Sequence, residues 1–119
     1  QPAPPRTGSA DRERQGSGPA RPAARATRQY ALGTAAGSLV TQARAQLARG
    51  EHALAAATLE RAMRIEPDNP LLWIELAKVR QAQGNAAQAE AMARKALAQA
   101  SGDARVEAAA WRVIEASLL

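Results

Sequence analysis

The stretch Pro70–Asp103, PLLWIELAKVRQAQGNAAQAEAMARKALAQASGD, decides the fold of this 119-residue chain. It is rich in Ala, Leu, Gln, Glu, Lys and Arg, which favour helix, and it is interrupted at Gly84-Asn85. Asn69 before Pro70 is typical of a helix N-cap followed by proline at the first helical position, where the missing N–H costs nothing. The stretch therefore predicts two helices, over 70–83 and 86–100, joined by a short turn.

The same pattern occurs once more, directly before this stretch. A shift by 34 superimposes Gly50 on Gly84, Ala55 on Ala89, Ala62 on Ala96, Ala43 on Ala77, Val40 on Ile74, Met63 on Leu97 and Arg61 on Lys95. Breaks at Gly50, at 67–70 and at 101–103 then predict three more helices, over 38–49, 52–66 and 104–118. Strand signals are almost absent from Ser38 onward, so we predict an all-α fold.

This period, with two helices per unit, resembles the tetratricopeptide repeat, whose units are about 34 residues long. The unit 70–103 carries the family pattern at Trp73, Leu76, Ala77, Gly84, Ala89 and Ala96. The unit 36–69 keeps Ala43, Gly50, Ala55, Ala62 and Pro67, but has Leu39, Gln42 and Gln46 where the pattern has Trp, Leu and Tyr. The resemblance implies a short helical solenoid of two helix-pair repeats, with 104–118 as a C-terminal capping helix.

The N-terminal residues have a different composition from the repeats. Residues 1–30 hold five of the seven prolines, six arginines and two acidic residues, and Tyr30 is their only sizeable apolar side chain. Such a segment cannot bury enough surface to offset its conformational entropy. We therefore predict a disordered Pro/Arg-rich tether over 1–30, a transition of undetermined order over 31–37, and the helical domain over 38–118.

The composition gives no support to catalysis, and we predict that the chain is not an enzyme. Cysteine is absent and His52 is the single histidine, which excludes thiol nucleophiles, thiolate metal sites and histidine clusters. No glycine-rich phosphate loop and no nucleophile elbow occurs. We expect His52 to be an ordinary packed or surface residue, and we expect no cofactor and no metal.

A row of cations recurs with the repeat period. Arg44, Lys78 and Arg112 are each separated by one period and occupy the ninth place of the first helix in each unit and in the cap. In the family this place points into the concave groove, so the resemblance implies a partner-binding surface there. We place in it Val40, Arg44, Ile74, Lys78, Arg105 and Arg112, with Val40 and Ile74 as apolar floor.

Such a groove suits a peptide that carries carboxylates. The competing interpretation is a solvated helix face whose cations pair with Glu75 or Glu115. The family's carboxylate clamp uses an Asn on the groove floor, and Gln81 and Thr41 are poor substitutes for it.

The net charge of +5 raises the question of a nucleic-acid partner. Residues 1–30 contribute +4 of this charge (six Arg against two acids), and residues 31–119 contribute +1 (ten Lys/Arg against nine acids). The tail lacks interleaved aromatic residues for base stacking, so nucleic acid is disfavoured against a solvated linker. An arm that contacts anionic lipid or cell-wall polymers is the remaining alternative.

A tether followed by a short repeat module resembles the outer-membrane lipoproteins with tetratricopeptide repeats that, in pseudomonads, activate a bifunctional class A penicillin-binding protein. The resemblance implies a periplasmic protein, anchored to the outer membrane through a lipid-modified residue before Gln1, that activates peptidoglycan synthesis by direct contact. The alternatives are a general adapter or chaperone for pilus, secretion or other envelope assembly, a polyanion binder acting through the tail, and a cytoplasmic location. No run of 18 apolar residues is present.

Overall fold

The computed structural model describes residues 29–119, and within them it contains five helices and no strand. The predicted tether lies outside the described residues, except for Gln29 and Tyr30. The helices are α3 (Thr34–Ala48), α4 (His52–Ile65), α5 (Pro70–Ala82), α6 (Ala86–Ala98) and α7 (Ala104–Ser117). The predicted all-α class is confirmed, and the predicted helix ends agree within two residues except at the start of α3.

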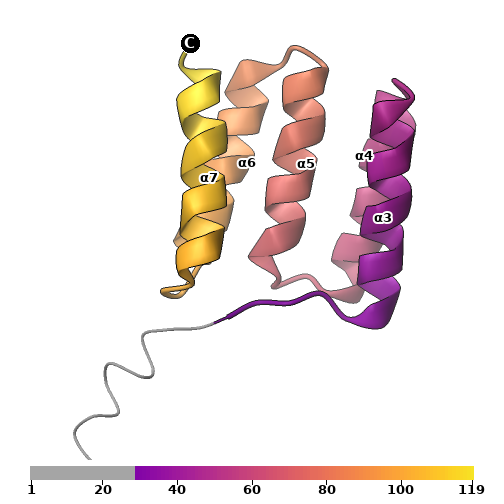
Figure 1. Ribbon diagram of the computed structural model, residues 1–119, viewed down its shortest axis with the longest axis horizontal. Coiled ribbons are helices and arrows are strands. Elements are labelled where there is room, and N and C mark those ends of the chain that lie inside the picture. Colours follow the sequence, from indigo (N-terminus) through magenta and orange to yellow (C-terminus); the bar gives the residue numbers. More distant parts are fainter. Residues whose placement is uncertain (1–28) are drawn as a thin grey trace, which may run out of the picture.

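The helices stand side by side in two layers. Helices α3, α5 and α7 form one layer, and α4 and α6 pack behind them, each antiparallel to the helix before it (Figure 1). This is the arrangement expected for two helix pairs followed by a single helix. None of the helices among residues 29–119 is long and apolar enough to cross a membrane.

The helix boundaries follow local signals. The Asn69 side chain accepts from the Leu71 N–H, Asn85 accepts from the Gln88 N–H, and Asp103 accepts from two backbone N–H groups of the first turn of α7. Gly50 and Gly84 end helices at φ of 80° and 79°, a region that costs other residues steric strain. The predicted Asn69 cap and the predicted breaks at Gly50 and Gly84 are confirmed.

Helix α3 begins at Thr34, earlier than the predicted start at Ser38. Ala36 is fully buried in the core, and the Gly37 N–H donates to the Gly33 carbonyl at 2.8 Å, so packing fixes a turn that composition left undetermined. Gly33 lets the Glu66 carboxylate approach closely, because a Cβ there would lie 2.7 Å from Oε2 and the flexible Glu66 side chain would have to move. The first turn is therefore held by contacts with residues far along the chain.

The core is made of small and aliphatic side chains in two clusters. The first joins α3 and α4 to one side of α5, and the second joins the other side of α5 to α6 and α7. Ala55, Ala62, Ala89 and Ala96 each have no exposed surface, as expected where helices cross closely. The repeat register predicted from the sequence is confirmed by this burial.

Candidate functional site

The three cations of the predicted row all reach the surface of the α3–α5–α7 layer, but their surroundings differ. The side chains of Arg44 and Lys78 are 63% and 48% exposed, and Arg112 is exposed as well. The repeat spacing therefore does place one cation on each first helix. What each cation contacts decides which of them is available to a ligand.

Glu75 of α5 occupies two of the three cations. Its side chain is 10% exposed, and it accepts from Nε of Arg44 at 3.1 Å and from Nη2 of the same guanidinium. Lys78 Nζ lies 3.9 Å from Oε2 of Glu75. The hydrogen bonds to Glu75 raise the pKa of Arg44, which keeps its charge in place. The interpretation in which the row pairs with Glu75 is confirmed for Arg44 and, at longer range, for Lys78.

A groove lies between α5 and α7 beside these residues. It has a volume of about 260 Å³, and its lining consists of Lys78, Gln81, Ala109, Arg112, Val113 and Ala116. The two cations stand on different helices, with alkyl groups between them. Within residues 29–119, Arg112 makes no hydrogen bond or ion pair, so it is the cation of the row most open to a carboxylate.

The apolar floor predicted for the groove is wrong. Val40 and Ile74 are each 2% exposed and belong to the two core clusters, so neither can contact a partner in this conformation. Val40 lies in the cluster shared with α4 and α5, and Ile74 lies in the cluster shared with α6 and α7. Ala109, Val113 and Ala116 supply the apolar lining in their place.

Arg105 lies near the start of α7 and does not extend the row freely. Its Nη2 donates to the Tyr30 carbonyl at 2.9 Å and lies 3.7 Å from Oδ2 of Asp103. It therefore holds the segment 29–33, called the strap here, against the last helix. The strap runs from α7 to α3 across the end of their layer (Figure 1).

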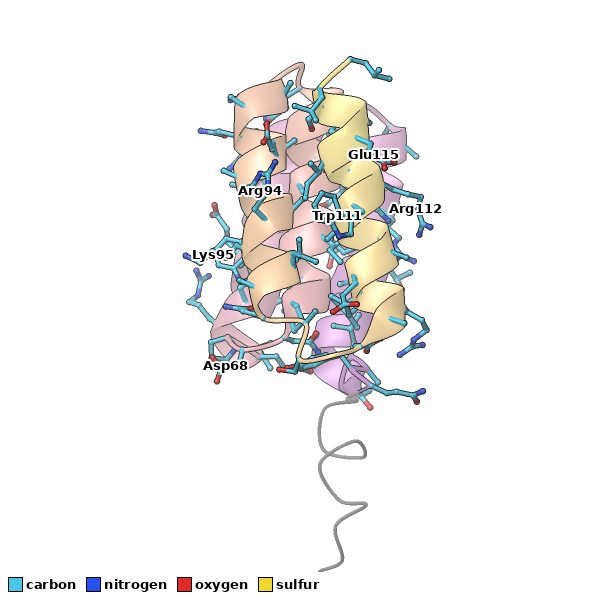
Figure 2. All side chains as sticks on the ribbon, turned by 90° about the vertical axis from the view of Figure 1, so that its left-hand side faces the viewer. Asp68, Arg94, Lys95, Trp111, Arg112 and Glu115 are labelled. Carbon is cyan, nitrogen blue, oxygen red and sulfur yellow. The ribbon has the colours of Figure 1, made fainter. Side chains whose placement is uncertain are left out.

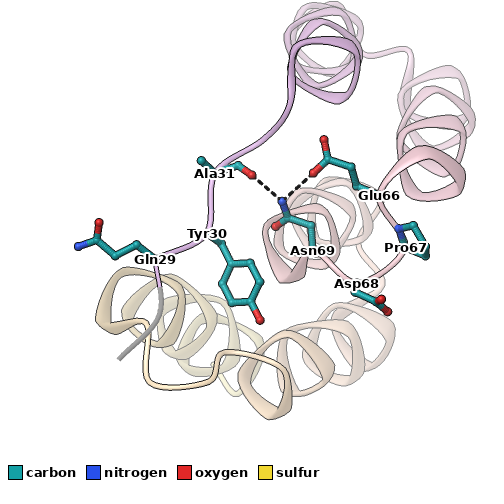
Figure 3. Close-up of a pocket in the computed structure, with 7 residues that line it drawn as sticks. All are labelled: Gln29, Tyr30, Ala31, Glu66, Pro67, Asp68 and Asn69. Carbon is teal, nitrogen blue, oxygen red and sulfur yellow. Dashed lines mark hydrogen bonds between the residues drawn. The ribbon is translucent and has the colours of Figure 1, made fainter. Parts of the chain in front are cut away.

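The strap is fixed at both ends by hydrogen bonds. At α7, the Tyr30 N–H donates to Oδ2 of Asp103 at 2.7 Å, and the Tyr30 hydroxyl donates to the Gln99 carbonyl at 3.1 Å. At the α4–α5 loop, Nδ2 of Asn69 donates to the Ala31 carbonyl at 2.9 Å (Figure 3). The bond from Tyr30 holds the pKa of Asp103 below its ordinary value. Sequence reasoning assigned Tyr30 to the tether and missed this element.

A second hollow, of about 360 Å³, lies between the strap and the α4–α5 loop (Figure 3). Its lining is polar, and the carboxylate of Glu66 in it already accepts from Asn69 and from the Gly33 N–H. Among the described residues, no group of three or more acidic or histidine side chains could hold a metal ion. His52 is the half-buried first residue of α4.

Trp111 of α7 is an exposed aromatic that sequence reasoning did not single out. It is 46% exposed, and it lies on the end of the module with Arg112 and Glu115 on the same helix and Arg94 and Lys95 on α6 (Figure 2). The signal was available, because Trp111 stands one repeat period after Ala77 and two after Ala43. A tryptophan where the other two first helices have alanine indicates that this position of α7 is not packed as Ala43 and Ala77 are.

Comparison with known proteins agrees with this architecture. A family model described as tetratricopeptide repeat matches residues 46–110. The solved structure of the globular C-terminal domain of P. aeruginosa LpoP is 41% identical in sequence, with a TM-score of 0.69, and the match covers 73% of this chain and 82% of that one. No curated protein sequence matches the chain.

Proposed function

Because this chain belongs to the tetratricopeptide repeat family, we propose that it is a non-catalytic interaction module that activates a class A penicillin-binding protein in the periplasm by direct contact. The family and the likeness to the LpoP domain support a protein-interaction role. The lipoprotein resemblance noted from the sequence supports the choice of a peptidoglycan synthase as the partner and an anchor in the outer membrane.

The observation that carries the proposal is the groove between α5 and α7. Its two cations and alkyl lining match a partner segment that carries a carboxylate beside an aliphatic side chain. Arg112 is open to that carboxylate, and Lys78 shares it from the opposite wall. Binding then desolvates charged hydrogen bonds, each of which contributes about 1.5–3 kcal/mol.

The experiment compares purified variants of the chain with a purified class A penicillin-binding protein. Lys78→Glu should weaken binding by about ten-fold or more, which is about 1.4 kcal/mol, and should reduce stimulation of glycan polymerisation in parallel. Arg61→Glu is the matched control, because Arg61 is an exposed cation of α4, in the other layer. Circular dichroism checks that both variants fold.

Two results would contradict the proposal. Normal binding by Lys78→Glu together with loss of binding by Arg61→Glu would place the contact on the outer helices. Absence of any binding or stimulation by the unmodified chain would exclude the synthase as a partner. An envelope-assembly adapter would then be the remaining proposal, and a stable complex with a pilus or secretion subunit would support it.

Residues 1–28 supply a separate test of the tether. Their deletion leaves the strap and all five helices in place, so binding and stimulation in solution should be nearly unchanged. Action in cells should be lost, because we propose that the deleted segment provides reach and anchoring. Equal loss in both assays would assign the segment to the binding surface instead.

A further inference from the structure

Each first helix of a unit buries one stripe of its surface against the two helices that follow it in the chain. On α3 the stripe includes Val40 and Ala43, both 2% exposed, in one cluster with side chains of α4 and α5. On α5 the stripe includes Ile74 and Ala77, 2% and 0% exposed, in one cluster with side chains of α6 and α7. The same stripe therefore has the same role in both units.

The same stripe on α7 has no helix over it among the described residues. A further shift by one repeat period places it at Ala104, Ala108, Trp111 and Glu115, all of which are exposed. Leu118, two turns beyond Trp111, is 66% exposed and continues the stripe. A helix face that nothing covers is normally polar, and this face is mostly apolar.

The helices that dock on the covered stripes share a pattern. Helix α5 contributes Leu72, Leu76 and Val79 to the first cluster. Helix α7 contributes Val106, Ala110 and Val113 to the second cluster, each one repeat period later. Both helices therefore present aliphatic side chains at positions i, i+4 and i+7, which lie on one helix face.

One ion pair accompanies the docking of α5 on α3. Glu75, at position i+3 of the α5 pattern, accepts two hydrogen bonds from Arg44 on the neighbouring helix. Arg112 occupies the place of Arg44 on α7, two repeat periods later, and it has no partner within residues 29–119. The exposed stripe and the unpaired cation thus repeat one half of an interface that is seen complete between α3 and α5.

We propose that the face formed by Ala104, Ala108, Trp111, Glu115 and Leu118, with Arg112 at its edge, docks an amphipathic helix of a partner protein. The docking helix carries aliphatic residues at i, i+4 and i+7 and a carboxylate at i+3. Trp111 replaces the alanines of the covered stripes, so the docked helix lies farther from α7 than α5 lies from α3, and the indole fills the added space. This inference does not depend on the partner being a synthase.

A second copy of the chain does not fit this face. Head-to-tail stacking would place α3 on α7, but the corresponding positions of α3 are Ser38, Gln42 and Ala45, with Thr41 in the place of the carboxylate. Antiparallel pairing of two α7 helices about a two-fold axis brings each edge against itself, so Arg112 would meet Arg112 of the other copy. A different protein that places a carboxylate at that edge would pair with Arg112 and avoid this repulsion between like charges.

The test uses a synthetic peptide of residues 69–83, which carries Leu72, Glu75, Leu76 and Val79 in the required pattern. The peptide is acetylated, amidated and stapled, because an isolated helix of this length is marginal in water. Titration of the isotopically labelled full chain should move the amide signals of Ala104, Ala108 and Leu118 and the indole signal of Trp111. A peptide with serine at the three aliphatic positions should move none of them.

Variants of the full chain then separate the outcomes. Trp111→Glu should weaken peptide binding by about ten-fold or more. Leu54→Glu is the matched control, because Leu54 is 51% exposed on α4, and it should leave the affinity within about two-fold. Arg112→Glu should also weaken binding, and a peptide with Glu75→Lys should restore it on that variant alone.

Four results would overturn the inference. The first is that the peptide does not bind, and the second is that Trp111→Glu binds it unchanged. The third is that the signal changes are confined to α3 or to the groove. The fourth is that the unliganded chain forms a dimer in sedimentation and that Trp111→Glu dissociates this dimer. The last result would assign the face to a second copy. Arg112 lines both the groove and this face, whereas Lys78 lines the groove alone. Loss of synthase stimulation by Lys78→Glu with peptide binding intact would show that this face binds its helix without the groove, which supports the inference.

Discussion

The backbone N–H of Tyr30 donates to Oδ2 of Asp103 across 2.7 Å, and this bond joins the start of the described chain to the cap of its last helix. Asp103 is 1% exposed and also accepts from the N–H groups of Arg105 and Val106. One carboxylate therefore holds both the strap and the first turn of α7. The ionisation of Asp103 should therefore control the stability of both the strap and the first turn of α7.

The first prediction concerns pH. The folded-state pKa of Asp103 is lowered below its ordinary value of 3.8, first by the bond from Tyr30, so the folded state binds a proton less readily than the unfolded state does. The stabilisation is therefore present above the ordinary pKa and is lost as the pH falls through and below it. Denaturant unfolding should show a gap in stability between the native chain and Asp103→Asn that narrows on acidification. A stability difference that stays constant with pH would show that the charge of Asp103 does not cause the stabilisation.

The second prediction concerns the strap hydroxyl. Tyr30→Phe removes the hydrogen bond to the Gln99 carbonyl and leaves the ring in place, so the free energy of unfolding should fall by about 0.5–1.5 kcal/mol. Hydrogen exchange should also accelerate at the Tyr30 amide. An unchanged unfolding midpoint and unchanged exchange would show that the hydroxyl does not hold the strap.

The third prediction concerns Glu75. Arg44→Met removes two hydrogen bonds from a nearly buried carboxylate and should cost about 0.5–1.5 kcal/mol, a value reduced because the guanidinium is largely exposed. Lys78→Met removes a contact at 3.9 Å and should cost less than about 0.5 kcal/mol. Thermal or denaturant unfolding measures both. The reverse order would mean that Lys78, and not Arg44, is the main partner of Glu75 in solution.

The fourth prediction concerns helix packing. Ala62→Leu or Ala89→Leu should cost about 1–3 kcal/mol, because both alanines are fully buried where helices cross. Ala53 lies on the exposed side of α4, so Ala53→Leu should change the free energy of unfolding little. Calorimetric melting of the three variants measures the difference, and equal effects at all three sites would contradict the packing described here.

The sequence predicts most of the helical domain because the helix caps and turn residues fall where the 34-residue repeat places them. Asn69-Pro70, Gly84-Asn85 and Asp103 act locally, and local signals can be read without knowing the fold. The predicted start of α3 is late because Gly33 and Gly37 favour loops locally, whereas burial of Ala36 decides in favour of helix. The correspondence of Ala36 with Pro70, one period apart, is the signal that could have moved this boundary.

The candidate site is predicted less completely, because its contacts are non-local. The period places Arg44, Lys78 and Arg112 on one layer, but spacing alone cannot show that Arg44 is bonded to Glu75 while Arg112 is open. Val40 and Ile74 are assigned to the groove on the ground that one turn separates them from the cations. The direction of their side chains depends on where the next helix packs, and a single helix pattern does not contain that information.

The strap determines where mechanical load enters the module. A pull applied to the chain before Gln29 first reaches the Tyr30 contacts with Asp103 and Arg105, which lie on the last helix although Tyr30 precedes the first. These bonds hold the chain ahead of helix α3, so they take up part of the tension before it reaches α3. A pull on the preceding chain therefore acts first on the C-terminal helix α7, at the end of the module opposite to the α3–α4 pair.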